Sequence, residues 1–431
     1  MTAIRSTAPA IRVVPQAAKA APARSTAAAP SKAERAVLTA PTAGNKVTLH
    51  VASTDSHQAL LESIRTAKSS FYIETFIWHN DKTGNEIVDA LAKRVALAKA
   101  KGESFDAKVM IDWFGLRQGT GGASDPEIIN KLKAAGVEAL EFAPGYINDG
   151  KLIPITHRKL YIQDGKQFIT GGRNIGDEYL GATFQGATGT EHAWHDLMYT
   201  VEGPETARII TEFMKNWKRS GGTVPAELPK TPSLPVGGAT AKVQSFVTNP
   251  HEKKTDLQKA HLGLIANAEK EIVAIYPYFS DDKLVDALIA AKKKNPALAV
   301  KVMMPANKEA GREGQVYTML NKETARQLMA AGIEVRMFAG GAVNRFSHFK
   351  GMVIDQKIVS IGSANGDERT MRSNHELNTV IADAATAKDF LKQVVTPDWA
   401  AAAPVTQADL KADGLWTRIK QTVLEALDFL L

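Results

Sequence analysis

Two histidines, 191 residues apart, begin the same short pattern of polar residues and glycine. The first stretch reads HRKLYIQDGKQFITGGRN from His157, and the second reads HFKGMVIDQKIVSIGSAN from His348. The residues shared at fixed offsets are His157, Lys159, Asp164, Gly171 and Asn174 in the first stretch and His348, Lys350, Asp355, Gly362 and Asn365 in the second. Five positions that recur in register indicate a duplicated chemical unit.

The residue types in this pattern suit a phosphodiester. Side chains alternate between the two faces of a strand, so each histidine and the lysine two residues later are expected on one face. If the copies meet about a pseudo-twofold axis, two lysines and two asparagines can donate hydrogen bonds to nonbridging oxygens. One imidazole can attack phosphorus, and the other can protonate the departing alcohol and deprotonate the incoming one. The residues themselves leave open which histidine does which.

Two acidic residues occupy equivalent places after the two motifs. The first motif is followed by HDLMYTV from His195 and the second by HELNTVI from His375, so Asp196 and Glu376 correspond. We expect each acid to orient a catalytic imidazole and to stabilise its imidazolium form, although either residue alone reads equally as a surface acid. A metal site at His192 and His195 is not favoured, because no third ligand stands at a suitable spacing.

The duplication extends around the motifs and predicts the fold. TAKSSFYIETFIWHND from Thr66 matches NAEKEIVAIYPYFSDD from Asn267, and LKAAGVEALEF from Leu132 matches LMAAGIEVRMF from Leu328. Short apolar runs alternate with helical patterns, and Gly136 and Gly332 are expected to end helices. This predicts an α/β protein of two duplicated domains, each a central mixed β-sheet flanked by helices, with the active site at their pseudo-twofold interface.

Composition sets the predicted domain boundaries. Residues 1–45 are rich in Ala, Pro, Ser and Thr and carry six basic side chains against one acidic one, which predicts a disordered basic tail. The remaining prediction is a first domain at 46–217, a Pro/Gly-rich linker at 218–240, a second domain at 241–400 and a C-terminal amphipathic helix within 401–431. Whether the stripe from Trp416 to Leu430 packs on the body or lies on a bilayer stays open.

Charge and composition exclude several classes of function. The whole chain has a net charge of +7 and no cysteine, so a cysteine nucleophile and thiolate metal sites are excluded. Most of the positive charge lies in residues 1–45, so the body shows no basic face typical of nucleic-acid binding. No apolar run reaches about 18 residues, so no transmembrane helix is expected.

The double motif resembles that of the phospholipase D superfamily, most closely its bacterial cardiolipin synthases and related phospholipase D-like proteins. GGRNIGDEYLG from Gly171 and GSANGDERTMRSNHE from Gly362 are similar to the extended pattern of that group, except that Thr370 stands where serine is usual. The resemblance implies a phosphohistidine intermediate, with His157 as nucleophile and His348 as general acid and base. It implies that Lys159, Lys350, Asn174 and Asn365 hold the phosphate. Asp164 and Asp355 would be supporting members of the catalytic motif, and no cofactor or catalytic metal is expected.

The sequence therefore predicts a phosphatidyltransferase or phospholipase D that acts on glycerophospholipids and resembles cardiolipin synthase. The alternatives are a hydrolase that releases phosphatidic acid, a nuclease or phosphodiesterase with the same double motif, and a non-catalytic membrane-binding scaffold. The expected partners are a phospholipid substrate and a membrane surface, without nucleic acid, and a monomer suffices for catalysis. We expect a cytoplasmic protein bound peripherally to the inner membrane, with a secreted toxin or effector as the alternative.

Overall fold

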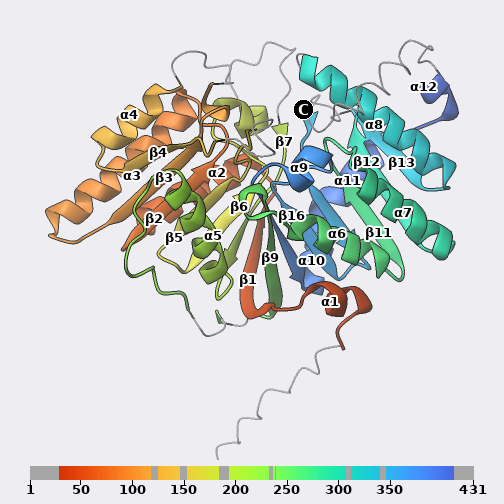
Figure 1. Cartoon of the computed structure of the whole chain (residues 1–431), viewed down its shortest axis with the longest axis horizontal. Helices are drawn as coiled ribbons and strands as arrows, with labels where there is room; N and C mark the ends of the chain where they lie inside the picture. The colour runs from red at the N-terminus through yellow and green to blue at the C-terminus, as the bar shows by residue number, and fades with distance from the viewer. Residues whose placement is uncertain are drawn as a thin grey trace, which may run out of the picture. The chain divides into compact units, whose positions relative to one another are not determined.

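The computed structural model describes residues 29–117, 125–145, 153–183, 194–232, 236–237, 239–306, 312–339 and 346–411. From Lys32 onward the chain forms one compact unit. In the described residues, one mixed sheet of 16 strands runs through both repeats in the order β18-β13-β12-β11-β15-β16-β17-β9-β1-β8-β6-β5-β2-β3-β4, with β10 paired to β9. Figure 1 shows the first repeat in orange to yellow-green on one side of β1 and β9 and the second in green to blue on the other.

The first repeat supplies one half of this sheet and the helices around it. Its strands are β1 (Thr42–His50), β2 (Ser70–Thr75), β3 (Asp106–Asp112), β4 (Glu138–Phe142), β5 (Leu160–Gln163), β6 (Gln167–Gly171) and β8 (Met198–Glu202). Its helices are α2 (Ser53–Thr66), α3 (Lys82–Ala100), α4 (Glu127–Ala134) and α5 (Thr206–Arg219).

The second repeat has the same order of main strands and helices, with several short elements added. Its strands are β9 (Ala241–Asn249), β10 (Lys254–Thr255), β11 (Glu271–Ile275), β12 (Ala299–Pro305), β13 (Glu334–Phe338), β15 (Gly351–Ile354), β16 (Ile358–Gly362), β17 (Glu376–Ala382) and β18 (Ala403–Pro404). Its helices are α6 (Asp256–Ala266), α7 (Asp282–Lys294), α8 (Arg312–Ala330), α9 (Glu368–Arg372), α10 (Ala384–Phe390), α11 (Thr396–Ala401) and α12 (Gln407–Lys411), with a π-helical turn at Leu391–Val395 between α10 and α11.

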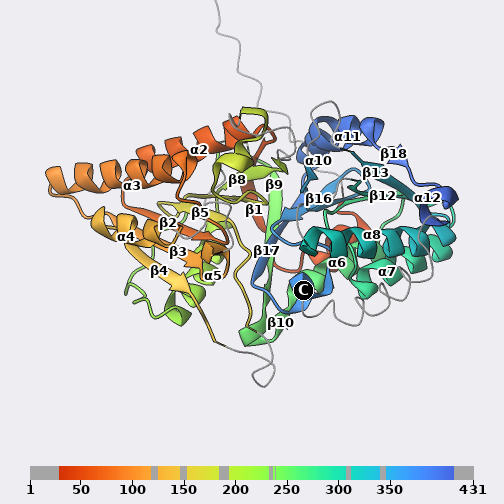
Figure 2. The same ribbon diagram turned by 90° about the horizontal axis from the view of Figure 1, so that it is seen from above.

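Pairing within the sheet confirms the predicted duplication and fold class. β2, β3 and β4 pair in parallel, and so do β11, β12 and β13, whereas β5 and β15 run antiparallel to β2 and β11. The repeats join where β1 pairs antiparallel with β9. Figure 2 shows β1, β9 and β17 between the two sets of helices.

Helix ends follow from local residues that recur in both repeats. The Asp81 side chain accepts a hydrogen bond from the backbone N–H of Gly84 and caps α3, and Asp281 caps α7 by accepting from Leu284. Gly136 and Gly332 follow α4 and α8 with φ of 80° and 75°, the left-handed conformation that ends a helix most easily at glycine. Both predicted helix stops are therefore present.

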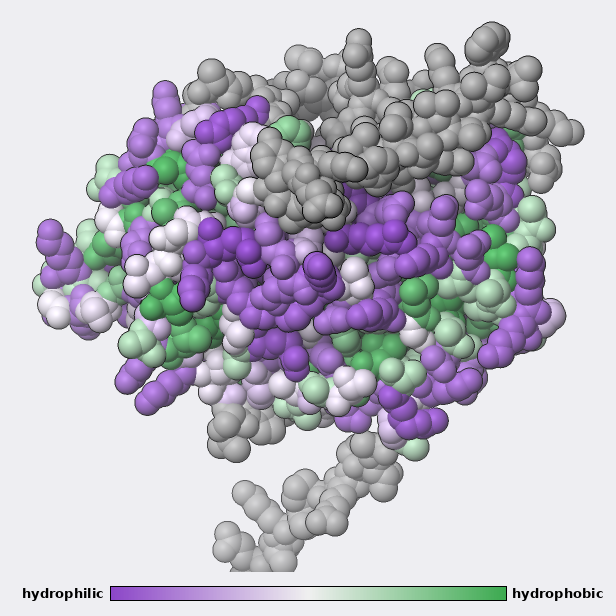
Figure 3. Space-filling view, in the orientation of Figure 1, coloured by the Kyte–Doolittle hydropathy of each residue, from purple (hydrophilic) through white to green (hydrophobic). Residues whose placement is uncertain are grey.

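Buried apolar residues form layers on both faces of the sheet. One cluster lies under α2, α3 and α4 and another under α6, α7 and α8, one for each repeat. A third cluster runs across both repeats beneath α5, α10 and the turn that follows it. The face in Figure 3 is mainly hydrophilic, with apolar residues in separate small groups.

Helix and strand are present before the predicted boundary at residue 46. Lys32–Val37 form α1, and β1 already begins at Thr42, so the predicted disordered tail was drawn too long. Ala33, Val37 and Leu38 are buried in the cluster of the second repeat, and this burial offsets the entropy of ordering a segment that reads as low-complexity. Residues 1–28 lie outside the described residues.

Two other predicted segments are only partly described. The described residues between α5 and β9 contain neither helix nor strand, as drawn for a linker, although α5 continues to Arg219. The predicted C-terminal helix at 401–431 is described only as far as residue 411, where β18 and α12 lie, and its apolar stripe from Trp416 to Leu430 lies outside the described residues, as does His192. Among the helices that are described, none has the length and apolar character needed to cross a bilayer.

Candidate active site

Each motif histidine lies in an extended segment that the backbone of the opposite repeat holds in place. The N–H of His157 donates to the carbonyl of His375 at 3.0 Å, and the N–H of His348 donates to the carbonyl of His195 at 2.9 Å. The short strands β7 (Trp194–His195) and β14 (Phe346–Ser347) pair in parallel across the repeats. Both histidines thus precede β5 and β15, the strands on which they were expected, because these cross-repeat contacts occupy their backbone.

The two predicted acids also reach across the repeats. His157 Nδ1 lies 2.9 Å from Glu376 Oε1, and His348 Nδ1 lies 2.6 Å from Asp196 Oδ2. Both carboxylates are essentially excluded from solvent. An imidazole that donates from Nδ1 leaves the lone pair of Nε2 free, which is the nitrogen available to a substrate. Each imidazole–acid pair therefore needs both halves of the chain.

The two lysines lie beside these pairs. Lys159 Nζ donates to the carbonyl of His157 at 2.8 Å, and Lys350 Nζ donates to that of His348 at 2.8 Å. Burial lowers the pKa of His157 well below its usual value, and the positive charges of Lys159 and Lys350 lower it further. Burial and Lys350 lower the pKa of His348 to about 3. Both lysines thus act on the reacting groups, and both imidazoles are neutral at pH 7 before an anion binds.

The acids of the two pairs differ in their electrostatics. Burial raises the pKa of Glu376 to about 8, even though Lys159 and a hydrogen bond from Ser363 act in the opposite direction. Burial would also raise the pKa of Asp196, but the charge of Lys350 and the contact with His348, including its hydrogen bond, outweigh burial and lower that pKa. The pair of His348 therefore contains an ionised acid, whereas the pair of His157 holds a carboxyl that retains its proton more strongly.

A glycine and a serine at equivalent positions account for part of this difference. A Cβ atom on Gly172 would lie 2.2 Å from Asp196 Oδ2, so only glycine leaves room for that carboxylate. The second motif has Ser363 instead, and its hydroxyl forms a short hydrogen bond with Glu376 Oε2 and accepts from the N–H of Leu377 at 3.1 Å. Ser363 lies outside the five shared positions, but the difference between GGRN and GSAN is a sequence signal that could have found it.

The two motif asparagines have different surroundings. Asn174 donates to the Tyr179 hydroxyl at 2.8 Å and accepts from the N–H of Ile77 at 3.3 Å, which leaves one amide hydrogen for a ligand. The side-chain oxygen of Asn365 is buried without a hydrogen-bond partner. Tyr179, which fixes Asn174, was missed by sequence reasoning because it lies beyond the five shared positions, in the 3-10 helix η3 (Asp177–Thr183).

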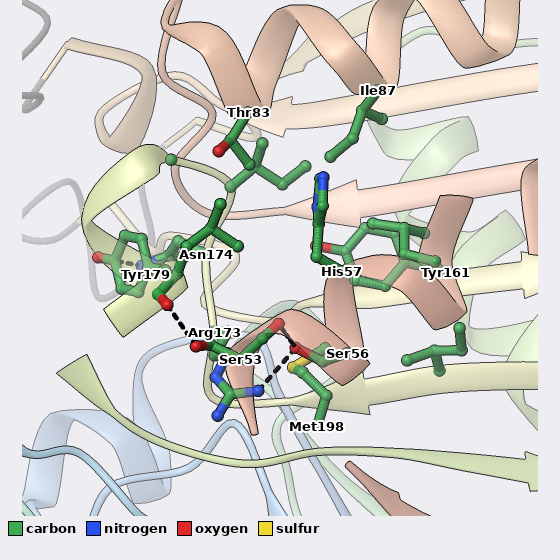
Figure 4. Close-up of a pocket in the computed structure, with 15 residues that line it drawn as sticks. Ser53, Ser56, His57, Thr83, Ile87, Tyr161, Arg173, Asn174, Tyr179 and Met198 are labelled. Carbon is green, nitrogen blue, oxygen red and sulfur yellow. Dashed lines mark hydrogen bonds between the residues drawn. The ribbon is translucent and has the colours of Figure 1, made fainter. Parts of the chain in front are cut away.

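A small cavity lies next to Asn174. Its volume is about 40 Å³, enough for a few water molecules but not for a lipid headgroup. Figure 4 shows Arg173 and Asn174, which follow β6, and Tyr179 of η3 on one side of it, and His57 from α2 and Ile87 from α3 on another. We therefore do not assign the substrate to this cavity.

The motif aspartates lie away from the histidines. The Asp164 carboxylate accepts hydrogen bonds from the backbone N–H groups of Lys68, Ser69 and Ser70, at the far end of β5 from Lys159. Asp355 accepts in the same way from residues 269–271. Both aspartates adopt a φ of 52° at the turn after their strand. This geometry agrees with a supporting role, not with contact to a reacting atom, although the prediction grouped them with the catalytic residues.

Aromatic rings flank both imidazoles. The Phe76 ring meets His157 edge-on at 5.1 Å between centroids, and Trp194 meets His348 at 4.6 Å. Trp78 and Phe279, which lie shortly after β2 and β11, are fully buried. Sequence reasoning missed Phe76 and Trp194 as neighbours of the histidines, because only the cross-repeat pairing brings them there.

In comparisons with known proteins, the chain is similar to cardiolipin synthases. Residues 262–397 match the family model described as "Cardiolipin synthase, PLD-like domain". The chain is 29% identical over 404 residues to the major cardiolipin synthase ClsA of Bacillus subtilis, covering 90% of this chain and 76% of that protein. It is 27% identical over 403 residues to the cardiolipin synthase of Listeria monocytogenes serotype 4a, with the same coverage.

The fold also has a solved counterpart. The crystal structure of phosphatidylserine synthase from Haemophilus influenzae superposes with a TM-score of 0.66 at 15% identity, covering 93% of this chain and 99% of that one. The likeness extends over both repeats and supports the fold alone. The double histidine motif, the domain match in the second repeat and the similarity to cardiolipin synthases over nine tenths of the chain together indicate an enzyme similar to those of the phospholipase D superfamily.

Proposed function

We propose that this enzyme is a phosphatidyltransferase that makes cardiolipin from phosphatidylglycerol through a phosphatidyl-histidine. The observation that carries the proposal is the pair of buried imidazole–acid contacts, His157 with Glu376 and His348 with Asp196, each built from both repeats. Two buried lysines beside them can bind a phosphodiester anion; burial lowers the pKa of Lys159 well below its usual value, and a bound anion opposes that shift.

In the first step, Nε2 of His157 attacks phosphorus, and the bond from phosphorus to the glycerol oxygen breaks. The departing alkoxide takes a proton from His348, so glycerol leaves as a neutral alcohol and the phosphatidyl group remains on His157. Burial keeps His157 neutral, as a nucleophile must be. The bound phosphodiester opposes the lysine charges that lower the pKa of His348, and this favours the protonated form that an acid needs.

In the second step, His348 accepts the proton of an incoming hydroxyl, whose oxygen attacks phosphorus and releases His157. The ionised Asp196 stabilises the imidazolium that forms at His348 in this step. When the hydroxyl belongs to a second phosphatidylglycerol, the product is cardiolipin. When water enters instead, the product is phosphatidic acid, so the acceptor distinguishes a transferase from a hydrolase. The assignment of His157 as nucleophile follows the superfamily resemblance.

We further propose that the enzyme works as a monomer bound peripherally to the cytoplasmic face of the inner membrane. The duplicated chain supplies both half-sites by itself, and the sequence from Asp413 to Leu431 has an apolar stripe that suits a bilayer surface. Removal of residues 413–431 is expected to reduce cosedimentation with phosphatidylglycerol vesicles. Unchanged cosedimentation would assign membrane contact to another part of the chain.

The proposed reaction is tested with purified protein and vesicles of phosphatidylglycerol and phosphatidylethanolamine, followed by lipid mass spectrometry. We expect new cardiolipin with the wild-type chain and at least a thousandfold loss with His157→Ala or His348→Ala. His50→Ala is a matched control, because this half-buried histidine bonds Thr200 in β1 and β8, outside the site. Phosphatidic acid alone would establish a hydrolase, and no change in any lipid would refute the proposal.

A further inference from the structure

The residues that precede the two acids are both histidines, and both insert into the opposite repeat. The His195 ring lies against Phe338 and Phe349 of the second repeat, with centroids 5.7 and 4.6 Å apart. The His375 ring lies edge-on against Phe142 of the first repeat at 5.0 Å. Because Phe142 and Phe338 end equivalent strands, the two contacts are related by the pseudo-twofold arrangement.

The imidazoles of these two histidines have different partners. His195 Nε2 lies 3.0 and 2.9 Å from the two oxygens of Asp398, so this nitrogen carries a hydrogen and donates it to the carboxylate. His375 Nε2 instead lies 2.9 Å from His251 Nδ1, a contact between two rings that needs one shared hydrogen. A carboxylate therefore fixes only the histidine beside Asp196.

Asp398 comes from an element outside the catalytic motifs. It lies on α11 and is 5% exposed, directly after the π-helical turn at Leu391–Val395. Such turns interrupt the regular helical register and are often retained at functional sites. The next residue anchors the helix, because the Trp399 carbonyl accepts from Arg336 and its ring lies 4.7 Å from that guanidinium. Asp398 is thus held firmly against His195.

His195 links this carboxylate to the reacting imidazole by two short routes. Its carbonyl accepts the backbone N–H of His348, and the next residue is Asp196, whose carboxylate contacts His348 Nδ1. A rotation of the His195 backbone would therefore move both groups that orient the His348 ring. The aromatic contacts alone do not set this rotation, since the ring can slide between them, whereas the hydrogen bond to Asp398 is directional.

We propose that Asp398 and His195 are positioning residues that hold Asp196 and His348 in the geometry required for proton transfer. The pair acts on one half-site only, because its counterpart in the other repeat is the His375–His251 contact. The kinetic part of this inference rests on the proposed function, whereas the geometry of the His348 ring can be measured without any substrate.

The first test is nuclear magnetic resonance of the full chain labelled with ¹⁵N-histidine. Asp398→Ala is expected to change the imidazole ¹⁵N shifts and the titration of His348 and to leave those of His157 unchanged. The signals are assigned with His157→Gln and His348→Gln. Unchanged His348 signals in Asp398→Ala would overturn the proposal, and this holds whether or not the enzyme turns over any lipid.

The second test is kinetic, with phosphatidylglycerol as substrate. Asp398→Ala is expected to lower kcat about tenfold with KM nearly unchanged, because a proton-transfer group is displaced while binding groups are not. Asp398→Asn, which can still accept from His195, should stay within about twofold of wild type. Combining Asp398→Ala with Asp196→Asn should cost less than the product of the two single losses, and a fully multiplicative loss would refute coupling.

A matched variant separates positioning from general loss of stability. Asp383 caps α10 on the same C-terminal helical segment by accepting from the N–H of Thr386 at 2.8 Å. Asp383→Ala should weaken the fold without changing kcat of the folded enzyme, and an equal loss of kcat would contradict a specific role of Asp398. If Asp398→Ala does not fold, His195→Gln and His195→Phe replace it: the first keeps a donor for Asp398 and should retain activity, whereas the second should not.

Discussion

Replacement of Gly172 by serine should disturb the contact of Asp196 with His348 and not that of Glu376 with His157. This is expected although the second repeat itself carries Ser363 at the equivalent position. A Cβ atom at residue 172 would lie 2.2, 2.4 and 2.6 Å from the Asp196 Oδ2, Oδ1 and Cγ atoms. Contacts of real Cβ atoms are essentially never shorter than 3.0 Å, so the carboxylate must retreat by about 0.8 Å. The contact of 2.6 Å with His348 Nδ1 cannot survive this movement as a good hydrogen bond.

The expected loss follows from that displacement. A catalytic group misplaced by about 1 Å costs on the order of a hundredfold in rate, which corresponds to about 2.7 kcal/mol of transition-state stabilisation. We expect Gly172→Ser to lower kcat by this factor with little change in KM. The assay is cardiolipin formation in phosphatidylglycerol vesicles, with folding checked by thermal unfolding.

Two further variants make the reasoning refutable. Gly237→Ala is the control, because a Cβ there meets nothing within 4 Å. Gly172→Ser combined with Asp196→Glu copies the Ser363–Glu376 arrangement and should recover part of the lost rate. A Gly172→Ser enzyme within twofold of wild type, with the contact of Asp196 to His348 intact by magnetic resonance, would show that the glycine is not required.

Three other predictions concern the supports of the site and its response to pH. Asp164→Ala orphans buried backbone N–H groups and should lower the free energy of unfolding by about 2–4 kcal/mol, measured by urea titration, while kcat of the folded fraction stays unchanged. Burial lowers the pKa of His261 to about 4, whereas in the unfolded chain this histidine titrates near 6.5. The free energy of unfolding therefore falls as the pH decreases from 6.5 towards 4, because the unfolded chain binds the proton first. His261→Gln should remove up to about 3 kcal/mol of this decrease, measured by denaturant titrations across that pH range. Ser363→Ala removes a donor that lowers the pKa of Glu376, so the ascending limb of kcat against pH should move to higher pH and kcat should fall about tenfold; an unmoved limb would contradict the assigned contact.

Much of this architecture could be predicted because the same pattern of elements occurs twice in the sequence. The recurrence of apolar strands, helix-ending glycines and the histidine motif predicted two α/β repeats. It also predicted that the site residues of both repeats lie close together. The sequence did not predict that each acid contacts the catalytic histidine of the opposite repeat. Asp196 contacts His348, and Glu376 contacts His157, only because β7, β14 and the extended segments pair across the repeats. Such pairing involves too few residues to leave a periodic signal.

Other differences arose from composition and from contacts between distant segments. The helix at Lys32–Val37 looked like part of a disordered tail, because its apolar surface is small and is buried against α6, which is distant in the sequence. His195 and His375 were quoted as part of the repeat, but their partners Asp398 and His251 lie 203 and 124 residues away. No local pattern predicts a contact at that separation.

The seam between β1 and β9 has a consequence for how the enzyme could be divided. If the chain were cut between α5 and β9, each fragment would carry a bare strand edge at the place where the sheet now continues. Each fragment would also lack the carbonyl and the carboxylate that fix its own histidine. Two such fragments in one solution can regain catalysis only by docking edge to edge, so recovery of activity on mixing would report assembly of the whole sheet. Neither fragment is expected to be active alone, so the activity of the mixture would serve as a reporter of fragment assembly.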